Sequence, residues 1–164
     1  MPATPLTLDD HRRFMALALE QARKGFEEGG IPVGAVIVKD GAVVAAGHNR
    51  RVQSGNPILH GEMDCLQAYG RQASYRDVTL YTTLNPCMMC AGTIVQFGIP
   101  TVVIGQEKVL EPPEHPFTGN IDFLRGRGVE VVLLNDPGCE ALFAEFLATN
   151  KTLWLEDIGE VSDG

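Results

Sequence analysis

The sequence predicts an α/β fold, a three-layer α/β/α sandwich built on a five-stranded mixed sheet. Segments with apolar residues at helical spacing alternate with short runs rich in Val and Ile. Several of these runs are apolar on both faces, which requires helices on both sides of the sheet. An Asp40-Gly41 turn joins the first two runs, so the sheet is expected to begin as an antiparallel hairpin. Helical crossovers then connect the later strands.

The first elements are a long helix and the hairpin. A helix is expected from about residue 8 to 28, with Thr7 as N-cap, Asp10 three positions on, and Gly29-Gly30 at its end. The apolar face of this helix is formed by Phe14, Leu17, Ala18 and Ala22. The two hairpin strands are expected at residues 33–38 and 43–46.

The rest of the chain alternates helices and strands. A loop at 48–59 precedes a short helix from His60 or Gly61 to about Tyr69, and Pro86 opens the next helix, which ends at Phe97. The region 105–128 contains three prolines and is expected to be partly loop. Further strands are expected at 78–84, 100–104 and 129–134, and further helices at 138–148 and around Trp154.

Composition indicates one globular domain covering residues 1–164. The hydrophobic class makes up 45% of the 164 residues and the charged class 21%, which is enough apolar material for a sizeable core. Lys and Arg total 13 against 21 Asp and Glu, a net charge of −8. A protein that binds phosphate backbones normally has the opposite sign, so the charge disfavours nucleic acid as a partner.

Location is expected to be cytoplasmic. No apolar run reaches the about 18 residues of a membrane span, so no membrane association is expected. The N-terminus lacks the basic region and apolar run of a secretory signal. Four cysteines are too few for a disulfide scaffold in a chain of this length, which favours a reducing compartment.

Two short motifs predict a metal centre: His60-Gly61-Glu62, and the segment Pro86 to Cys90 that reads Pro-Cys-Met-Met-Cys. Cys87 and Cys90 are three residues apart and share one face of a helix. Pro86 in the first turn places Cys87 near unpaired backbone N–H groups, where the helix dipole favours the thiolate that zinc needs. Together the motifs match the H-x-E and P-C-x-x-C signature of zinc nucleobase deaminases.

The expected cofactor is one Zn²⁺ per chain. His60, Cys87 and Cys90 give three ligands, which leaves one position for a water or hydroxide and is typical of catalytic zinc. A closed structural site needs a fourth ligand, for which Cys65 is the nearest candidate. Glu62 is expected to act as the catalytic proton shuttle. Glu62 and His60 can point into one site only if His60 sits at the helix cap with non-helical backbone angles.

At these residues the chain resembles the zinc-dependent cytosine deaminase-like superfamily, in particular the small free-base, fungal-type cytosine deaminases. The resemblance covers nearly the whole chain, including Gly30 to Ala35, Gly47 to Asn49 and Trp154 to Glu160. The last block closes the pocket in the fungal enzymes and is lacking in tRNA adenosine deaminases. The resemblance implies the cytidine deaminase-like fold, hydrolysis of cytosine to uracil and ammonia in pyrimidine salvage, and a homodimer.

The resemblance also implies roles for individual residues. His60, Cys87 and Cys90 match the metal ligands and Glu62 the proton shuttle, while a C-terminal helix at about 150–160 closes the pocket. Asn85 stands where the family has Ser, and Leu110 falls near an aromatic residue that packs on the ring. The substrate-binding positions implied in this way are Asn49, Gly61, Asp157, Trp154, Ile31, Asn85 and Leu110.

Several alternatives stay open at this point. Asn85 and Leu110 alter the pocket, so another small ring such as creatinine or guanine is a second hypothesis. The N-terminal half is equally similar to tRNA adenosine deaminases, although the negative charge argues against an RNA substrate. A non-catalytic zinc module would leave Glu62 unexplained. Taken alone, Asn49 is typical of a turn, Asp157 of a solvated tail, and the pair Arg50-Arg51 of an exposed surface.

Overall fold

The computed structural model describes residues 4–108 and 119–160, and it confirms the predicted α/β sandwich. Five strands form one mixed sheet in the order β2-β1-β3-β4-β5. The strands are β1 (Gly34–Lys39), β2 (Ala42–His48), β3 (Thr79–Leu84), β4 (Thr101–Gln106) and β5 (Glu130–Leu133). The helices are α1 (Leu8–Glu27), α2 (Arg51–Ser54), α3 (Gly61–Tyr69), α4 (Met88–Phe97), α5 (Asn120–Gly126) and α6 (Pro137–Asp157).

The sheet changes from antiparallel to parallel at β3. β1 pairs antiparallel with both β2 and β3, whereas β3–β4 and β4–β5 are parallel. The predicted hairpin turn is present, with Asp40 and Gly41 both at positive φ (51° and 75°) as a type I′ turn requires. The helix α4 connects β3 to β4, so its N-terminus lies at the carboxyl end of β3.

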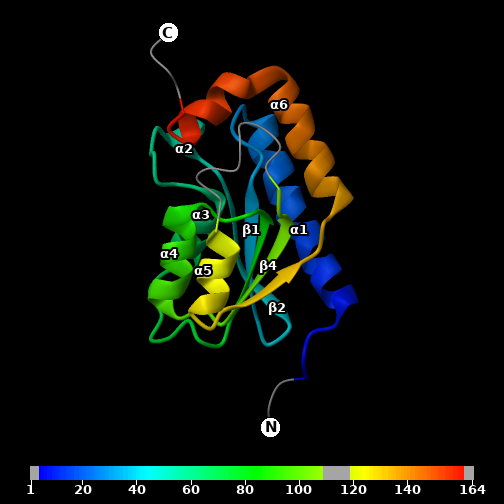
Figure 1. Cartoon of the computed structure of the whole chain (residues 1–164), viewed down its shortest axis with the longest axis vertical. Coiled ribbons are helices and arrows are strands. Elements are labelled where there is room, and N and C mark those ends of the chain that lie inside the picture. Colours follow the sequence, from blue (N-terminus) through cyan, green and yellow to red (C-terminus); the bar gives the residue numbers. More distant parts are fainter. Residues whose placement is uncertain (1–3, 109–118, 161–164) are drawn as a thin grey trace.

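Helices cover both faces of the sheet (Figure 1). One buried cluster joins α4 and α5 to the strands, and it includes Leu80, Ile94 and Leu124. A second cluster packs α1 and the start of α6 against the opposite face, and it includes Phe14, Tyr81 and Cys139. The neighbours Leu80 and Tyr81 therefore point to opposite layers, and both are fully buried. This burial explains why β3 carries a large side chain on each face.

Most predicted elements are present, with three corrections. The Thr7–Asp10 capping box begins α1 as expected, but Leu17 is 38% exposed and does not belong to the core. The region 48–59 contains the short helix α2, and the region 105–128 contains α5, neither of which was predicted. Cys87 is the N-cap of α4, one step outside the helix rather than in its first turn. None of the helices in the described residues is long and apolar enough to cross a membrane.

The helix α6 bends sharply at Asn150, whose backbone is non-helical (φ −135°, ψ 33°). In a straight helix, Phe143 and Trp154 would lie about 16 Å apart along the axis. The bend instead brings their rings to a centroid distance of 4.9 Å in an edge-to-face arrangement. The two helices predicted at 138–148 and around Trp154 are the two arms of α6, the first before Asn150 and the second after it. The bend turns the second arm back toward the sheet.

Candidate active site

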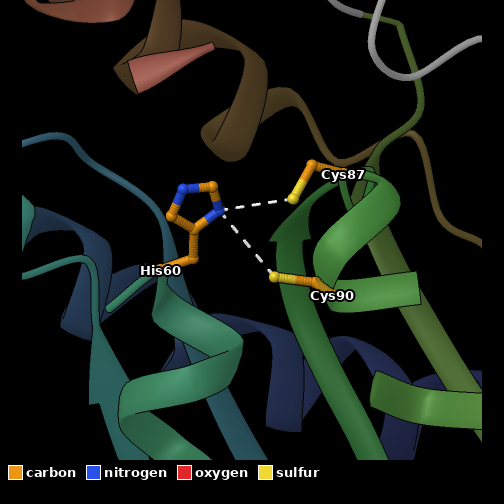
Figure 2. Close-up of side chains that lie close together, drawn as sticks. All are labelled: His60, Cys87 and Cys90. Atoms are coloured by element: carbon orange, nitrogen blue, oxygen red, sulfur yellow. Dashed lines mark hydrogen bonds between the residues drawn. The ribbon is translucent and has the colours of Figure 1, made fainter. Parts of the chain in front are cut away.

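Two helix N-termini face each other and bring the predicted metal ligands together (Figure 2). His60 is the N-cap of α3 and Cys87 is the N-cap of α4, both with extended backbone angles. The Nδ1 atom of His60 lies 3.4 Å from Sγ of Cys87 and 3.8 Å from Sγ of Cys90. The non-helical cap that sequence reasoning required for His60 is therefore present.

The donor set fits zinc. Zinc–nitrogen and zinc–sulfur bond lengths place donor atoms about 3.5 Å apart around a tetrahedral ion, and the three donors here lie within 4.8 Å of one another. Among the described residues, no fourth His, Cys or carboxylate joins this group. Cys65 lies instead in the apolar cluster that contains Leu80 and Ile94, so it is not a fourth ligand. Three soft or imidazole donors with one open position are typical of catalytic zinc.

The surroundings of the three ligands shift the pKa values of Cys87 and His60 in opposite directions. Hydrogen bonding from Cys90 and the neighbouring His60 lower the pKa of Cys87 to about 4, against the opposing effect of burial. Burial lowers the pKa of His60, but contacts with Asp157 and Cys87 outweigh burial and raise it to about 11. The lowered pKa favours the thiolate form of Cys87, which is the form that coordinates zinc.

Glu62 occupies the first turn of α3, beside the ligands. Its side chain is almost fully buried, and burial together with the charge of Cys87 raises the pKa of its carboxyl group. Gly61 permits this arrangement, since a Cβ at Gly61 would lie 2.8 Å from the carbonyl oxygen of Val33. A raised pKa makes a carboxylate a better proton acceptor, as a general base requires.

A small cavity opens next to the ligands. Its walls come from five parts of the chain: the segment before β1, the end of β2, the start of α3, the end of β3 with the loop that follows, and the second arm of α6. The residues that line it are Val33, Asn49, His60, Glu62, Leu84, Asn85, Cys87, Trp154 and Asp157.

Three polar side chains give this cavity a defined hydrogen-bonding character. The oxygen Oδ1 of Asn49 accepts from the backbone N–H of Arg51 (3.0 Å), which leaves the Asn49 amide N–H₂ group to offer to a ligand. Asn85 has the opposite polarity: its Nδ2 donates to the Glu107 carbonyl (3.1 Å), while its buried Oδ1 has no hydrogen-bond partner among the described residues. Oδ1 of Asp157 is likewise buried, and it faces the ring of His60 and the guanidinium of Arg51.

Arg51 connects α2 to the second arm of α6. Its guanidinium pairs with Glu156, and its Nε lies 3.7 Å from Oδ1 of Asp157. The same Asp157 oxygen lies 3.3 Å from Nε2 of His60, on the side of the ring that faces away from the cysteines. Asp157 is therefore buried at the site rather than solvated. Arg50 also pairs, with Asp64 at 2.9 Å, so both arginines take part in ion pairs at the surface of the domain.

The predicted substrate positions divide into three groups. Asn49, Asn85, Trp154 and Asp157 line the cavity. Ile31 and Gly61 are not among its lining residues. Gly61 begins α3, whereas Ile31 is fully buried in the apolar cluster that holds Trp154, and Val33, two residues on, takes the wall position. Leu110 lies outside the described residues. Val33 and Leu84 also line the cavity but were not predicted from the sequence. Both lie at the ends of predicted strands, and residues at strand ends can line a site at the edge of a sheet.

Comparison with known proteins agrees with this geometry. The family model for the cytidine and deoxycytidylate deaminase zinc-binding region matches residues 8–106. A cytosine deaminase from Candida albicans is 44% identical over 158 residues, which cover 94% of this chain and all of the relative. A tRNA-specific adenosine deaminase from Streptococcus pyogenes is 40% identical over 104 residues, covering 62% of this chain and 65% of the relative.

Solved structures show the same fold. The guanine deaminase from Nitrosomonas europaea superimposes with a TM-score of 0.72 at 25% identity, covering 88% of this chain and 87% of that one. The chain belongs to the family defined by the cytidine and deoxycytidylate deaminase zinc-binding region. It is a zinc-dependent hydrolytic deaminase, and His60, Cys87 and Cys90 form the group that can hold the metal.

Removal of one ligand is expected to abolish zinc binding. The Cys90→Ala variant should lose its zinc, and its unfolding midpoint should fall to that of the chelated wild-type protein because the ion joins α3 to α4. Zinc content by atomic absorption and urea unfolding measure both effects. Cys65→Ala is the matched control, since Cys65 is equally buried but lies in a different cluster. Equal zinc loss in both variants would contradict the assignment.

Proposed function

We propose that this deaminase acts on a small free heterocyclic base, and that the base is cytosine. The main support is the Candida albicans cytosine deaminase, which aligns with 94% of the chain and is matched over its entire length. The tRNA-specific relative aligns with only 62% of the chain. The site adds a physical reason: Trp154 and Asp157, from the last turns of α6, wall the small cavity beside the zinc group.

The proposed reaction replaces the exocyclic amine of the ring by oxygen. When bound, zinc supplies Lewis-acid chemistry that makes water nucleophilic near neutral pH. Glu62 takes a proton from the attacking water as the carbon–oxygen bond forms, gives it to the ring nitrogen, and later helps to protonate the amine. The carbon–nitrogen bond then breaks and ammonia leaves. Asn49 and Asp157 orient the ring, with Asn49 as donor and Asp157 as acceptor.

Guanine is the second candidate. The Nitrosomonas europaea guanine deaminase has the same fold, and Asn85 offers a buried oxygen without a partner beside the cavity. Creatinine is a further small ring that the same chemistry could hydrolyse. A tRNA substrate is disfavoured by the net charge of −8, because contacts with a phosphate backbone require many Lys and Arg side chains.

Release of ammonia from a panel of compounds tests the proposal. We expect cytosine to give the highest kcat/KM among cytosine, cytidine, guanine, creatinine and tRNA. Glu62→Gln should keep its zinc but lose about 10²- to 10⁴-fold in kcat, the usual contribution of a general acid–base group. Asp64→Asn is the control, because Asp64 lies two residues further along α3 and binds Arg50 and the His48 backbone N–H. This variant should affect stability more than turnover. If wild-type protein releases ammonia from guanine alone, the cytosine assignment is wrong.

We propose that Asp157 recognises the base by accepting a hydrogen bond from it. The pocket is closed by the C-terminal arm at about residues 150–160. Asp157→Asn should lower kcat/KM for cytosine by about tenfold or more, since a hydrogen bond to a charged group is worth about 1.5–3 kcal/mol. Glu156→Gln is the control, because Glu156 also pairs with Arg51 but does not line the cavity. Equal losses in both variants would mean that pairing with Arg51, and not contact with the base, is what matters.

We also propose that the enzyme is a homodimer. An apolar groove runs between α3 and α4, and its rim carries Ile58 (52% exposed) and Phe97 (44% exposed). Side chains of this size at the surface are typical of an interaction site. Ile58→Asp should shift the mass measured by sedimentation from dimer to monomer. Leu17→Asp, on the exposed face of α1 across the sheet, should not. A wild-type protein that sediments as a monomer would refute the proposal.

Pyrimidine salvage in the cytoplasm is the proposed setting. All four cysteines are free thiols, and two of them belong to the zinc group. A reducing compartment keeps such thiols available for a metal. Hydrolysis of a free base to uracil would return the ring to nucleotide synthesis.

A further inference from the structure

The hydroxyl group of Thr82 lies against the carboxylate of Glu62. Thr82 is in the middle of β3 and is fully buried. Its Oγ1 lies 3.1 Å from Oε1 of Glu62 and also 3.1 Å from the carbonyl oxygen of Leu84. Thr82 does not line the cavity and belongs to neither zinc motif. We infer that Thr82 is a positioning residue that holds Glu62 in place throughout the reaction, an inference that rests on the proposed function.

The two contacts of this hydroxyl group differ in chemistry. A hydroxyl has one proton to donate and two lone pairs that accept, whereas a backbone carbonyl can only accept. When Glu62 is a carboxylate, the hydroxyl can donate to its Oε1. When Glu62 carries the proton taken from water, the hydroxyl can turn its own proton to the Leu84 carbonyl and accept from the carboxylic acid. The Oγ1 position is the same in both states, and the threonine proton is never transferred.

The backbone around Thr82 makes this contact rigid. β3 is a central strand, and Thr82 is paired with Ala35 of β1 on one side and with Ile104 of β4 on the other. Threonine is branched at Cβ, which restricts rotation of its side chain. Small displacements of a catalytic group are costly in rate, so an anchor on a central strand suits a residue that must transfer a proton more than once.

The next residue in the strand provides a matched control. Thr83 is also buried, but it points to the opposite layer, where its Oγ1 accepts from the backbone N–H of Gly34 (3.0 Å). It makes no hydrogen bond with Glu62. Replacement of either threonine by valine removes one buried hydroxyl with little change of shape. Only Thr82→Val removes a contact with the proposed proton shuttle.

Steady-state kinetics on zinc-loaded protein test the inference. With cytosine, Thr82→Val should lower kcat at least about tenfold, part of the about 10²- to 10⁴-fold that acid–base catalysis contributes, with KM and zinc content unchanged. Thr82→Ser, which keeps the hydroxyl, should restore most of the rate. Thr83→Val should lower the unfolding midpoint but leave kcat close to that of the wild type. The serine and alanine variants of Thr82 give a second pair if the valine variant folds poorly.

A double mutant separates positioning from a purely structural role. In the Glu62→Gln background, Thr82→Val should cause little further loss, because the group that it positions is already disabled. Additive losses, an unchanged kcat in Thr82→Val, or equal losses in the valine and serine variants would each overturn the inference. Failure of the proposed function would look different, since wild-type protein would then release no ammonia from cytosine.

Discussion

The active site depends on two helix caps that face each other near the end of β3. Both helices must begin there, since His60 and Cys87 are the cap residues themselves. Extended backbone angles at each cap turn the side chain into the site, while the first turn of each helix brings a second functional group, Glu62 from α3 and Cys90 from α4. Unpaired N–H groups and the helix dipole make this the natural place for thiolates and a carboxylate.

The bend in α6 completes the site from a distant part of the sequence. A straight helix would carry Trp154 and Asp157 past the edge of the sheet, so neither could reach His60. The bend at Asn150 instead packs Trp154 against Phe143 and brings Asp157 within 3.3 Å of the His60 ring. A carboxylate on the outer nitrogen of a metal-binding histidine fixes the orientation and tautomer of the ring. Asp157 thereby lies beside the metal group and also lines the cavity.

Local patterns predicted the fold and the metal group well, because they depend on short-range spacing. The capping box at Thr7 and Asp10, the Asp40-Gly41 turn and the Cys87–Cys90 interval each involve only a few residues. Contacts between distant segments were not predictable in this way. Thr82 and Glu62 are twenty residues apart in the chain, and no motif marks the threonine. The pairing of Arg51 with Glu156 spans most of the domain, and an Arg-Arg pair alone is typical of exposed surface.

The polarity of the cavity restricts what can bind there. Asn49 has already used its oxygen within the protein and presents N–H donors, whereas Asn85 holds a buried oxygen without a hydrogen-bond partner among the described residues. Asp157 adds a buried carboxylate beside His60 and Arg51. A buried polar atom without a partner costs free energy, so a ligand that donates to the Asn85 oxygen is favoured over one that cannot. A neutral ring with both N–H groups and a carbonyl oxygen satisfies all three side chains. A phosphate group offers only acceptors and negative charge, and it would meet Asp157 and Glu62 with nothing to donate.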